Sequence, residues 1–174
     1  MNREEQARVR QIVTHPLYQQ EFSALQRAEK DRIYCSHTME HFLDVARICY
    51  ILCLEDEVQI PCVTIYAAAL LHDLGRNRQI AEGIPHEEAG AELAEEILAD
   101  CGFAEAQRRE IREAILHHRH HAGPAEEKTG APAAKSPLGN YLYRADKLSR
   151  LCFCCAASAD CKWSEEEKNQ GITV

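Results

Sequence analysis

The adjacent pair His72 and Asp73 stands at the end of an alanine- and leucine-rich stretch, residues 65–73. Imidazole nitrogens and carboxylate oxygens together suit divalent iron, manganese, zinc or magnesium. Two neighbouring side chains can both reach one ion if the helix that carries them ends there. We expect Gly75 to supply that ending, as a left-handed cap residue. Further candidate ligands occur along the chain at His37, His86, His118 and Asp146.

The elements that must position these residues are helices. Strand signals are almost absent, whereas apolar residues recur with helical periodicity. The periodicity predicts helices over residues 2–14, 17–32, 37–55, 61–74, 86–101, 104–120 and 137–150. We therefore predict an all-α chain: residues 1–150 form one compact helical bundle of about six to seven helices, and residues 151–174 form a cysteine-rich tail packed on it. Residues 122–134 form the one obvious long loop.

Each candidate ligand extends an apolar stripe of its helix. His118, for example, follows Ile111 and Ile115 at helical spacing, whereas its rival His117 points about 100° away from that stripe. Five separate segments would thus direct a ligand toward the core, where an unpaired polar side chain is costly. A single histidine in such a place is more often a core or capping residue. The ordered series His, His-Asp, His, His, Asp is what indicates a shared site.

Composition narrows the classes of function. The chain has 174 residues and a formal net charge of −8, which argues against non-specific nucleic-acid binding. No apolar run approaches the length of a membrane span, and the charged N-terminus lacks the apolar stretch of a signal peptide. We therefore expect a cytoplasmic protein. In that reducing compartment, its nine cysteines indicate metal or thiol chemistry rather than disulfides.

At these residues the sequence resembles the HD-domain metal-dependent phosphohydrolases. The resemblance covers about residues 37–150 and rests on His37 in His-Thr-Met-Glu-His, on His72-Asp73 in Leu-Leu-His-Asp-Leu-Gly-Arg, and on Asp146 in Tyr-Arg-Ala-Asp-Lys-Leu. With His86 and His118 added, the chain is similar to a subset that holds two metals, which includes the bacterial diadenosine tetraphosphate hydrolases. The resemblance implies an all-α bundle of the HD-domain type.

The resemblance also implies one or two divalent ions, which could be iron, manganese, zinc, magnesium, nickel or cobalt. The ligands of the first ion would be His37, His72, Asp73 and Asp146. A second ion would be held by His86 and His118, with Asp73 as the bridge. Such ions polarise a phosphoryl oxygen and make hydroxide at neutral pH.

Two residues are expected to act directly in catalysis. Asp73 would do so through the ions, and Arg76 would contact the substrate phosphate with its guanidinium fork. Arg76 could equally be a solvated cation at a helix end. His41, one turn after His37, is expected to support the site or the core rather than to bind metal.

These features favour metal-dependent hydrolysis of a phosphate ester or anhydride, with a nucleotide or another small phosphate compound as substrate and no membrane partner. Two alternatives stay open. One is a non-catalytic regulatory module that binds metal or a nucleotide, and the other is a di-iron oxygenase of the same fold. The oligomeric state is open as well, with a homodimer as one arrangement.

The tail contains a second pattern that is typical of metal ligands. Cys152, Cys155 and Cys161 have the spacing C-x2-C-x5-C, and Cys35 could be the fourth ligand. Four such thiolates would suit a structural zinc ion or an iron–sulfur cluster. The alternative is that these cysteines are small buried residues or free thiols.

Overall fold

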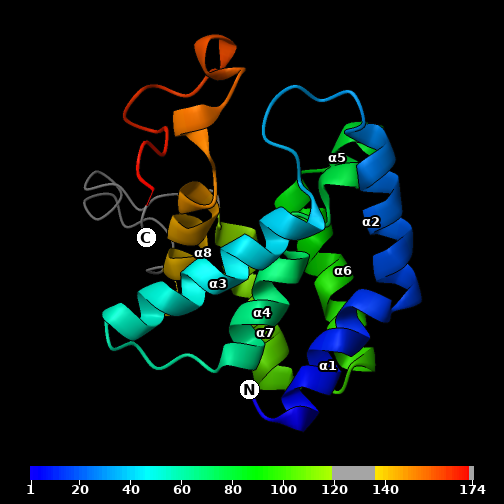
Figure 1. Ribbon diagram of the computed structural model, residues 1–174. Coiled ribbons are helices and arrows are strands. Elements are labelled where there is room, and N and C mark those ends of the chain that lie inside the picture. Colours follow the sequence, from blue (N-terminus) through cyan, green and yellow to red (C-terminus); the bar gives the residue numbers. More distant parts are fainter. Residues whose placement is uncertain (119–135, 173–174) are drawn as a thin grey trace, which may run out of the picture.

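The computed structural model describes residues 1–118 and 136–172, and within them every regular element is a helix (Figure 1). This confirms the all-α prediction. The α-helices are α1 (Arg3–Thr14), α2 (Pro16–Ala28), α3 (Met39–Glu55), α4 (Cys62–Leu71), α5 (Arg76–Glu82), α6 (His86–Asp100), α7 (Glu105–His117) and α8 (Pro137–Leu148). Two short 3-10 helices, η1 (Cys152–Cys154) and η2 (Ser158–Asp160), follow in the tail.

Each of the seven predicted helices has a counterpart, but α5 was not predicted. None of its residues is buried, so it lacks the apolar periodicity by which the other helices were found. The predicted end of α7 at residue 120 and the long loop at residues 122–134 lie outside the described residues.

Local signals set several helix starts. Asn2 accepts a hydrogen bond from the backbone of Glu5, whose side chain bonds back to Asn2, which is a capping box at the start of α1. Ser136 caps α8 in a similar way, with Pro137 in the first helical position. Such signals are local in the chain, so the sequence predicts these helix starts well.

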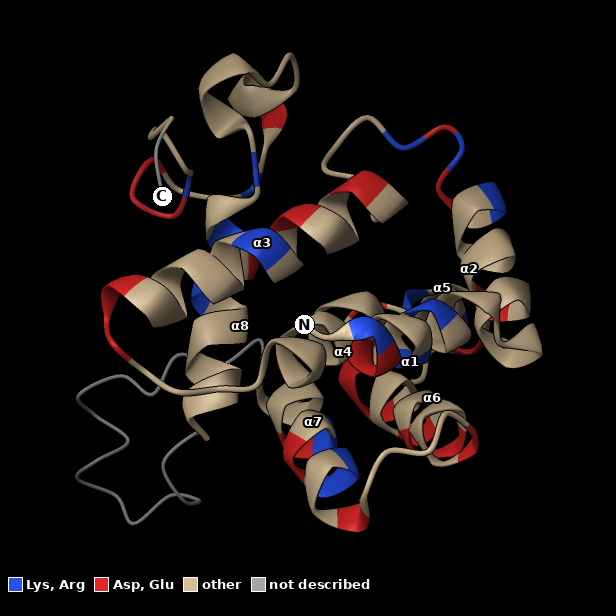
Figure 2. Cartoon of the chain, turned by 60° about the horizontal axis from the view of Figure 1, so that its bottom comes forward, with Lys and Arg blue, Asp and Glu red and all other residues tan. Residues whose placement is uncertain are grey.

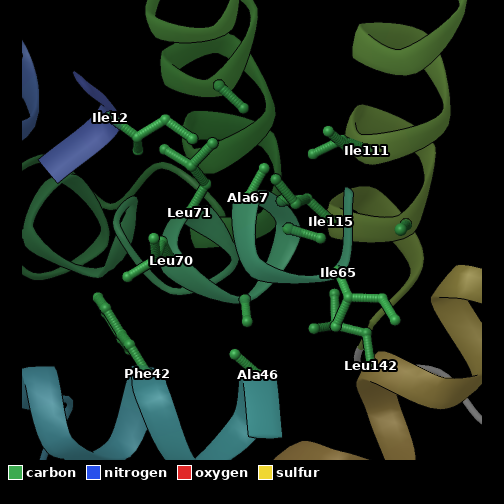
Figure 3. Close-up of a cluster of buried hydrophobic side chains, with 14 of the residues drawn as sticks. Ile12, Phe42, Ala46, Ile65, Ala67, Leu70, Leu71, Ile111, Ile115 and Leu142 are labelled. Atoms are coloured by element: carbon green, nitrogen blue, oxygen red, sulfur yellow. The ribbon is translucent and has the colours of Figure 1, made fainter. Parts of the chain in front are cut away.

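Helix α4 is the centre of the core. It carries no charged residue and is buried on nearly all sides, as expected for a helix that is apolar all round. It packs against α1, α3, α6, α7 and α8. Figure 3 shows its Ile65, Ala67, Leu70 and Leu71 among Ile12 of α1, Phe42 and Ala46 of α3, Ile111 and Ile115 of α7 and Leu142 of α8. Because α4 runs through the interior, its last turn delivers His72 and Asp73 to a buried position.

The prediction that Gly75 ends α4 as a left-handed cap residue was wrong. Its backbone angles are φ −69° and ψ −7°, which are right-handed, so no left-handed cap ends α4. Glycine is needed there for space instead. A Cβ atom on Gly75 would lie 2.2 Å from the carbonyl oxygen of His86 and 2.5 Å from the backbone nitrogen of Gly90. The missing side chain lets the start of α6 approach the end of α4, which brings His86 beside Asp73.

Figure 2 shows Asp and Glu residues gathered along α6. Within residues 1–118 and 136–172, no helix is both long enough and apolar enough to cross a membrane.

Candidate metal centre

The carboxylate of Asp73 is the midpoint of the site and is only 1% exposed. One of its oxygens, Oδ2, lies 3.1 Å from Nε2 of His72 and 3.4 Å from Nε2 of His37. The other oxygen, Oδ1, lies 3.3 Å from Nε2 of His86 and 3.7 Å from Nε2 of His118. The two oxygens of one carboxylate therefore face two different sets of imidazoles.

Metal-ligand atoms form two groups in the described part of the chain, and Asp73 belongs to both. The potential ligand atoms of each group lie within 4.8 Å of one another. The first group is His41, His72, Asp73 and Asp146, and the second is Asp73, His86 and His118. All of these residues are buried. The protein thus has a buried His/Asp cluster with the donor types that divalent metals take.

His37 and His41 both approach Asp73, but only His41 belongs to a ligand group. Its Nε2 lies 3.4 Å from Oδ1 of Asp146 and 4.0 Å from Oδ2 of Asp73. This nitrogen is buried and has no hydrogen-bond partner among the described residues. His37 instead makes two contacts with Glu29. Oε1 of Glu29 lies 2.7 Å from Nδ1 of His37, and Oε2 of Glu29 accepts a hydrogen bond from the backbone N–H of His37 at 2.8 Å.

Hydrogen bonds on the far sides of the rings set the orientation of the imidazoles. Nδ1 of His72 donates to the carbonyl of Ala69 at 2.7 Å, and Nδ1 of His118 donates to the carbonyl of Ile115 at 2.6 Å. A carbonyl can only accept, so Nδ1 must carry the proton in both rings. Each Nε2 then offers a lone pair toward Asp73 in the neutral imidazole. Outer hydrogen bonds of this kind are typical of metal-binding histidines.

Both carboxylates of the cluster are ionised, and a metal that binds there would displace a proton from His72. Burial, together with the charges of Arg150 and His72, lowers the pKa of His41 to about 2, so this imidazole is neutral. Burial also acts to lower the pKa of His72, but Asp73 and Asp146 outweigh it and raise the pKa to about 9. Although burial opposes ionisation of both carboxyls, their cationic neighbours hold the pKa of Asp73 and of Asp146 well below the usual range. The cluster thus holds two carboxylates that a metal could neutralise.

His117 and His118 occupy different environments. His118 is 2% exposed and lies in the cluster, whereas His117 is on the exposed face of α7. This is the arrangement that the Ile111–Ile115 stripe predicts for the two histidines.

Two guanidinium groups flank the centre. Nε of Arg76 donates to Oδ1 of Asp73 at 2.9 Å. Nη2 of Arg150 donates to Oδ1 of Asp146 at 2.7 Å and lies 3.9 Å from Oδ2 of Asp73. Arg150 is only 6% exposed, and it was not among the site residues predicted from the sequence. Its spacing of four residues after Asp146 was the one available signal, because side chains at that spacing share a helix face.

A cavity of about 420 Å³ opens beside the centre, with His37, Arg76 and Asp146 in its wall. Its lining is basic, although the chain as a whole is acidic. Six cationic side chains line it, against the carboxylates of Asp146 and Asp160: Arg32, Arg76, Lys147, Arg150, Lys162 and Lys168. Tyr34 and Trp163 add aromatic surface. The cavity is therefore suited to an anionic compound with an aromatic part.

Fold and site together define an all-helical protein with a buried His/Asp metal-binding cluster. The family model of the HD domain matches residues 38–151, so the chain belongs to the HD domain family. The matched stretch includes His41 and begins directly after His37.

Two known proteins are similar to this chain over most of its length. An uncharacterized protein of Clostridium beijerinckii is 39% identical over 141 residues, which are 81% of this chain and 82% of that protein. The crystal structure of a predicted HD superfamily hydrolase from an uncultured Thermotogales bacterium has a similar fold, with a TM-score of 0.58 and 24% identity. That similarity covers 87% of this chain and 81% of the other. The two chains thus share their fold.

Proposed function

We propose that this protein is a metal-dependent phosphohydrolase that cleaves a phosphate ester or anhydride of a nucleotide at a centre of two divalent ions. One observation carries the proposal: Oδ1 and Oδ2 of the buried Asp73 face separate imidazole groups, each with its own set of potential ligand atoms. A carboxylate in that position can bridge two ions. Ions bound there would polarise a phosphoryl oxygen and supply hydroxide near neutral pH.

The geometry leads us to propose different ligands for the first ion from those expected from the sequence. We assign His41, His72, Asp73 and Asp146, because their ligand atoms lie within 4.8 Å of one another. The second ion would be held by Asp73, His86 and His118. His41 thus replaces His37, in agreement with the span of the family match.

His37 then has a different proposed role. It lines the cavity, its Nε2 points to the centre, and Glu29 holds its Nδ1 at 2.7 Å. A carboxylate in this position fixes the orientation of the imidazole ring, as in other His–carboxylate pairs. We propose that Nε2 of His37 delivers a proton to the leaving oxygen of the substrate.

The basic cavity supports the substrate class. Arg76 and Arg150 stand on two sides of Asp73 and can each offer a guanidinium fork to phosphate oxygens. In the wall of the same cavity, Nζ of Lys147 lies 4.3 Å from the centre of the Trp163 ring. An aromatic ring in the wall of a phosphate-binding cavity offers a face on which a nucleobase can stack.

The proposal is tested on protein purified without oxygen. Metal content is measured first, and phosphate release is then followed over a panel of mono-, di- and triphosphate nucleotides and diadenosine tetraphosphate. Asp73→Asn is the matched control, because it keeps the shape of the side chain and removes its charge. Phosphate release by the wild type that disappears in the control supports the proposal. Oxygen consumption without phosphate release would point to the oxygenase alternative, and nucleotide binding without turnover would point to a regulatory module.

A further inference from the structure

Four cysteines line the cavity, and none of them belongs to the two His/Asp ligand groups. Cys152, Cys155 and Cys161 come from the tail, and Cys35 comes from the segment between α2 and α3. All four are free thiols. Figure 1 shows that segment and the tail at the same end of the molecule. A hydrogen bond from Oη of Tyr34 to the carbonyl of Asp160, at 3.3 Å, also joins them.

The tail has a defined path but no apolar core to hold it. Of residues 151–172, Cys152 is the single buried residue, and Leu151 and Phe153 are 62% and 41% exposed. Segments this short that fold without a core usually depend on disulfides or a metal. The described thiols form no disulfide, and hydrogen bonds such as those from Asn169 to the carbonyls of Leu148 and Arg150 hold the tail. A metal bound by the thiols would fasten it further.

We propose that Cys35, Cys152, Cys155 and Cys161 bind a [4Fe–4S] cluster that fastens the tail to the segment before α3. The spacing between the thiols favours a cluster over a single ion. Zinc–sulfur bonds of about 2.3 Å would hold the four sulfurs of a tetrahedral site about 4 Å apart. In the described residues no group of three such sulfurs lies within 4.8 Å. A cluster takes each thiolate at a different iron, so its ligand sulfurs stand farther apart.

Hydrogen-bond donors and cations surround the thiols. The backbone N–H of Asn169 bonds to the sulfur of Cys152, although burial raises the pKa of that thiol overall. Hydrogen bonds to the ligand sulfurs are a common feature of iron–sulfur sites. Arg150 and Lys168 share the cavity wall with the thiols, and Nζ of Lys168 donates to the carbonyl of Ser158 at 2.9 Å. These cations would balance the negative charge of a cluster bound by four thiolates.

The cluster would have a structural role. Four thiolates occupy every iron, so no position is left for substrate. Its effect on the active site would be indirect, because the tail that it fastens contributes Lys162 and Trp163 to the cavity. The proposal does not depend on the hydrolytic activity, since the thiols and the His/Asp cluster bind through different ligands.

The experiment measures acid-labile sulfide, because the His/Asp centre contains none. The full chain is purified without oxygen and reconstituted with ferric iron, sulfide and a thiol reductant, which together supply both iron oxidation states of the cluster. We expect about four sulfides and four irons per chain, in addition to metal in the His/Asp centre, with the broad visible absorption of thiolate-bound iron. Cys155→Ser should lose the sulfide, whereas Cys154→Ser should keep it, because Cys154 is exposed and is not in the cavity wall.

Three results would overturn the proposal. The first is wild-type protein without labile sulfide after reconstitution. The second is one tightly bound zinc ion that Cys155→Ser removes, because that result means a single-ion site. The third is equal loss of sulfide in Cys154→Ser and Cys155→Ser. Circular dichroism would reveal whether Cys155→Ser folds. If it does not, the sulfide content of the wild type and of Cys154→Ser still tests whether the protein binds a cluster.

Discussion

Nε2 of His86 lies 3.3 Å from Nε2 of His118, in a buried position beside Oδ1 of Asp73. Nδ1 of His118 donates to a carbonyl, so in the neutral ring its Nε2 carries a lone pair. Nδ1 of His86 lies 3.0 Å from Oε2 of Glu87. The two Nε2 atoms need a proton or a cation between them, because their lone pairs would otherwise repel each other. A metal ion held by the second ligand group would fill that place.

This relationship predicts unequal effects of two adjacent substitutions. His118→Ala should weaken binding of the second ion by more than about 10-fold, because it removes a buried ligand. His117→Ala is the matched control and should leave metal content unchanged, because His117 is exposed. Metal-to-protein ratios after dialysis against graded chelator compare the two variants. The reverse order would mean that the wrong histidine has been assigned to the centre.

Asp73→Ala should remove both ions, since Asp73 belongs to both ligand groups. We expect turnover to fall by more than about 10³-fold, which corresponds to about 4 kcal/mol of lost transition-state stabilisation. Inductively coupled plasma analysis and phosphate release measure the two effects on the same samples. A variant that keeps one full metal equivalent would show that Asp73 is not the bridge.

Substitutions of His37 and of His41 should lower the activity for different reasons. His41→Ala should lower metal content together with activity. His37→Ala should keep its metal, and its kcat should fall by about 10²- to 10⁴-fold, the usual range for loss of a general acid. Added imidazole should partly restore activity to His37→Ala and not to His41→Ala. If His37→Ala loses metal and His41→Ala does not, His37 is the ligand, as the sequence resemblance implied.

Gly75→Ala should destabilise the fold, because its Cβ would lie 2.2 Å from the backbone oxygen of His86. Backbone atoms cannot move aside as a flexible side chain can, so we expect a cost of about 3 kcal/mol, which is roughly 6–12 °C in Tm for a chain of this size. The control is Gly139→Ala, whose Cβ would meet its nearest atom at 3.4 Å. Thermal unfolding followed by circular dichroism compares them, and equal Tm values would refute the steric argument.

The link between the end of α3 and α8 should depend on pH. Arg144 and Tyr141 each donate to Oδ2 of Asp56 at 2.8 Å, and these bonds lower the pKa of Asp56 below its usual 3.8. A lowered pKa in the folded state gives stability that is present above the unfolded pKa and is lost as the pH falls through the folded pKa. Asp56→Asn should therefore lower Tm at about pH 6, and the difference from wild type should shrink below about pH 4.

The control for this effect is Asp44→Asn. Asp44 is an exposed residue of the same helix and pairs only with its neighbour Arg47 among the described residues. Its Tm should stay close to that of the wild type at both pH values. A Tm difference for Asp56→Asn that is as large at about pH 3 as at about pH 6 would contradict the proposed linkage.

The sequence by itself determined every α-helix of the described residues except α5, and most of the residues that the structure gathers in the His/Asp cluster. An apolar repeat of 3.6 residues, a proline in the first turn or a capping serine acts within one element, so it can be read along the chain. For the same reason, the Ile111–Ile115 stripe was enough to place His118 inside and His117 outside.

Contacts between elements were decided only by the tertiary structure. His37 and His41 are one turn apart, and which of them meets Asp146 depends on how α8 packs across α3. Arg150 enters the centre because the chain continues past α8 toward Asp73, and Gly75 is needed because α6 approaches the end of α4. Helical periodicity shows which side of one helix faces the core. It does not show which other elements form that core. The pairing of particular side chains depends on packing between segments far apart in the chain, which no local pattern contains.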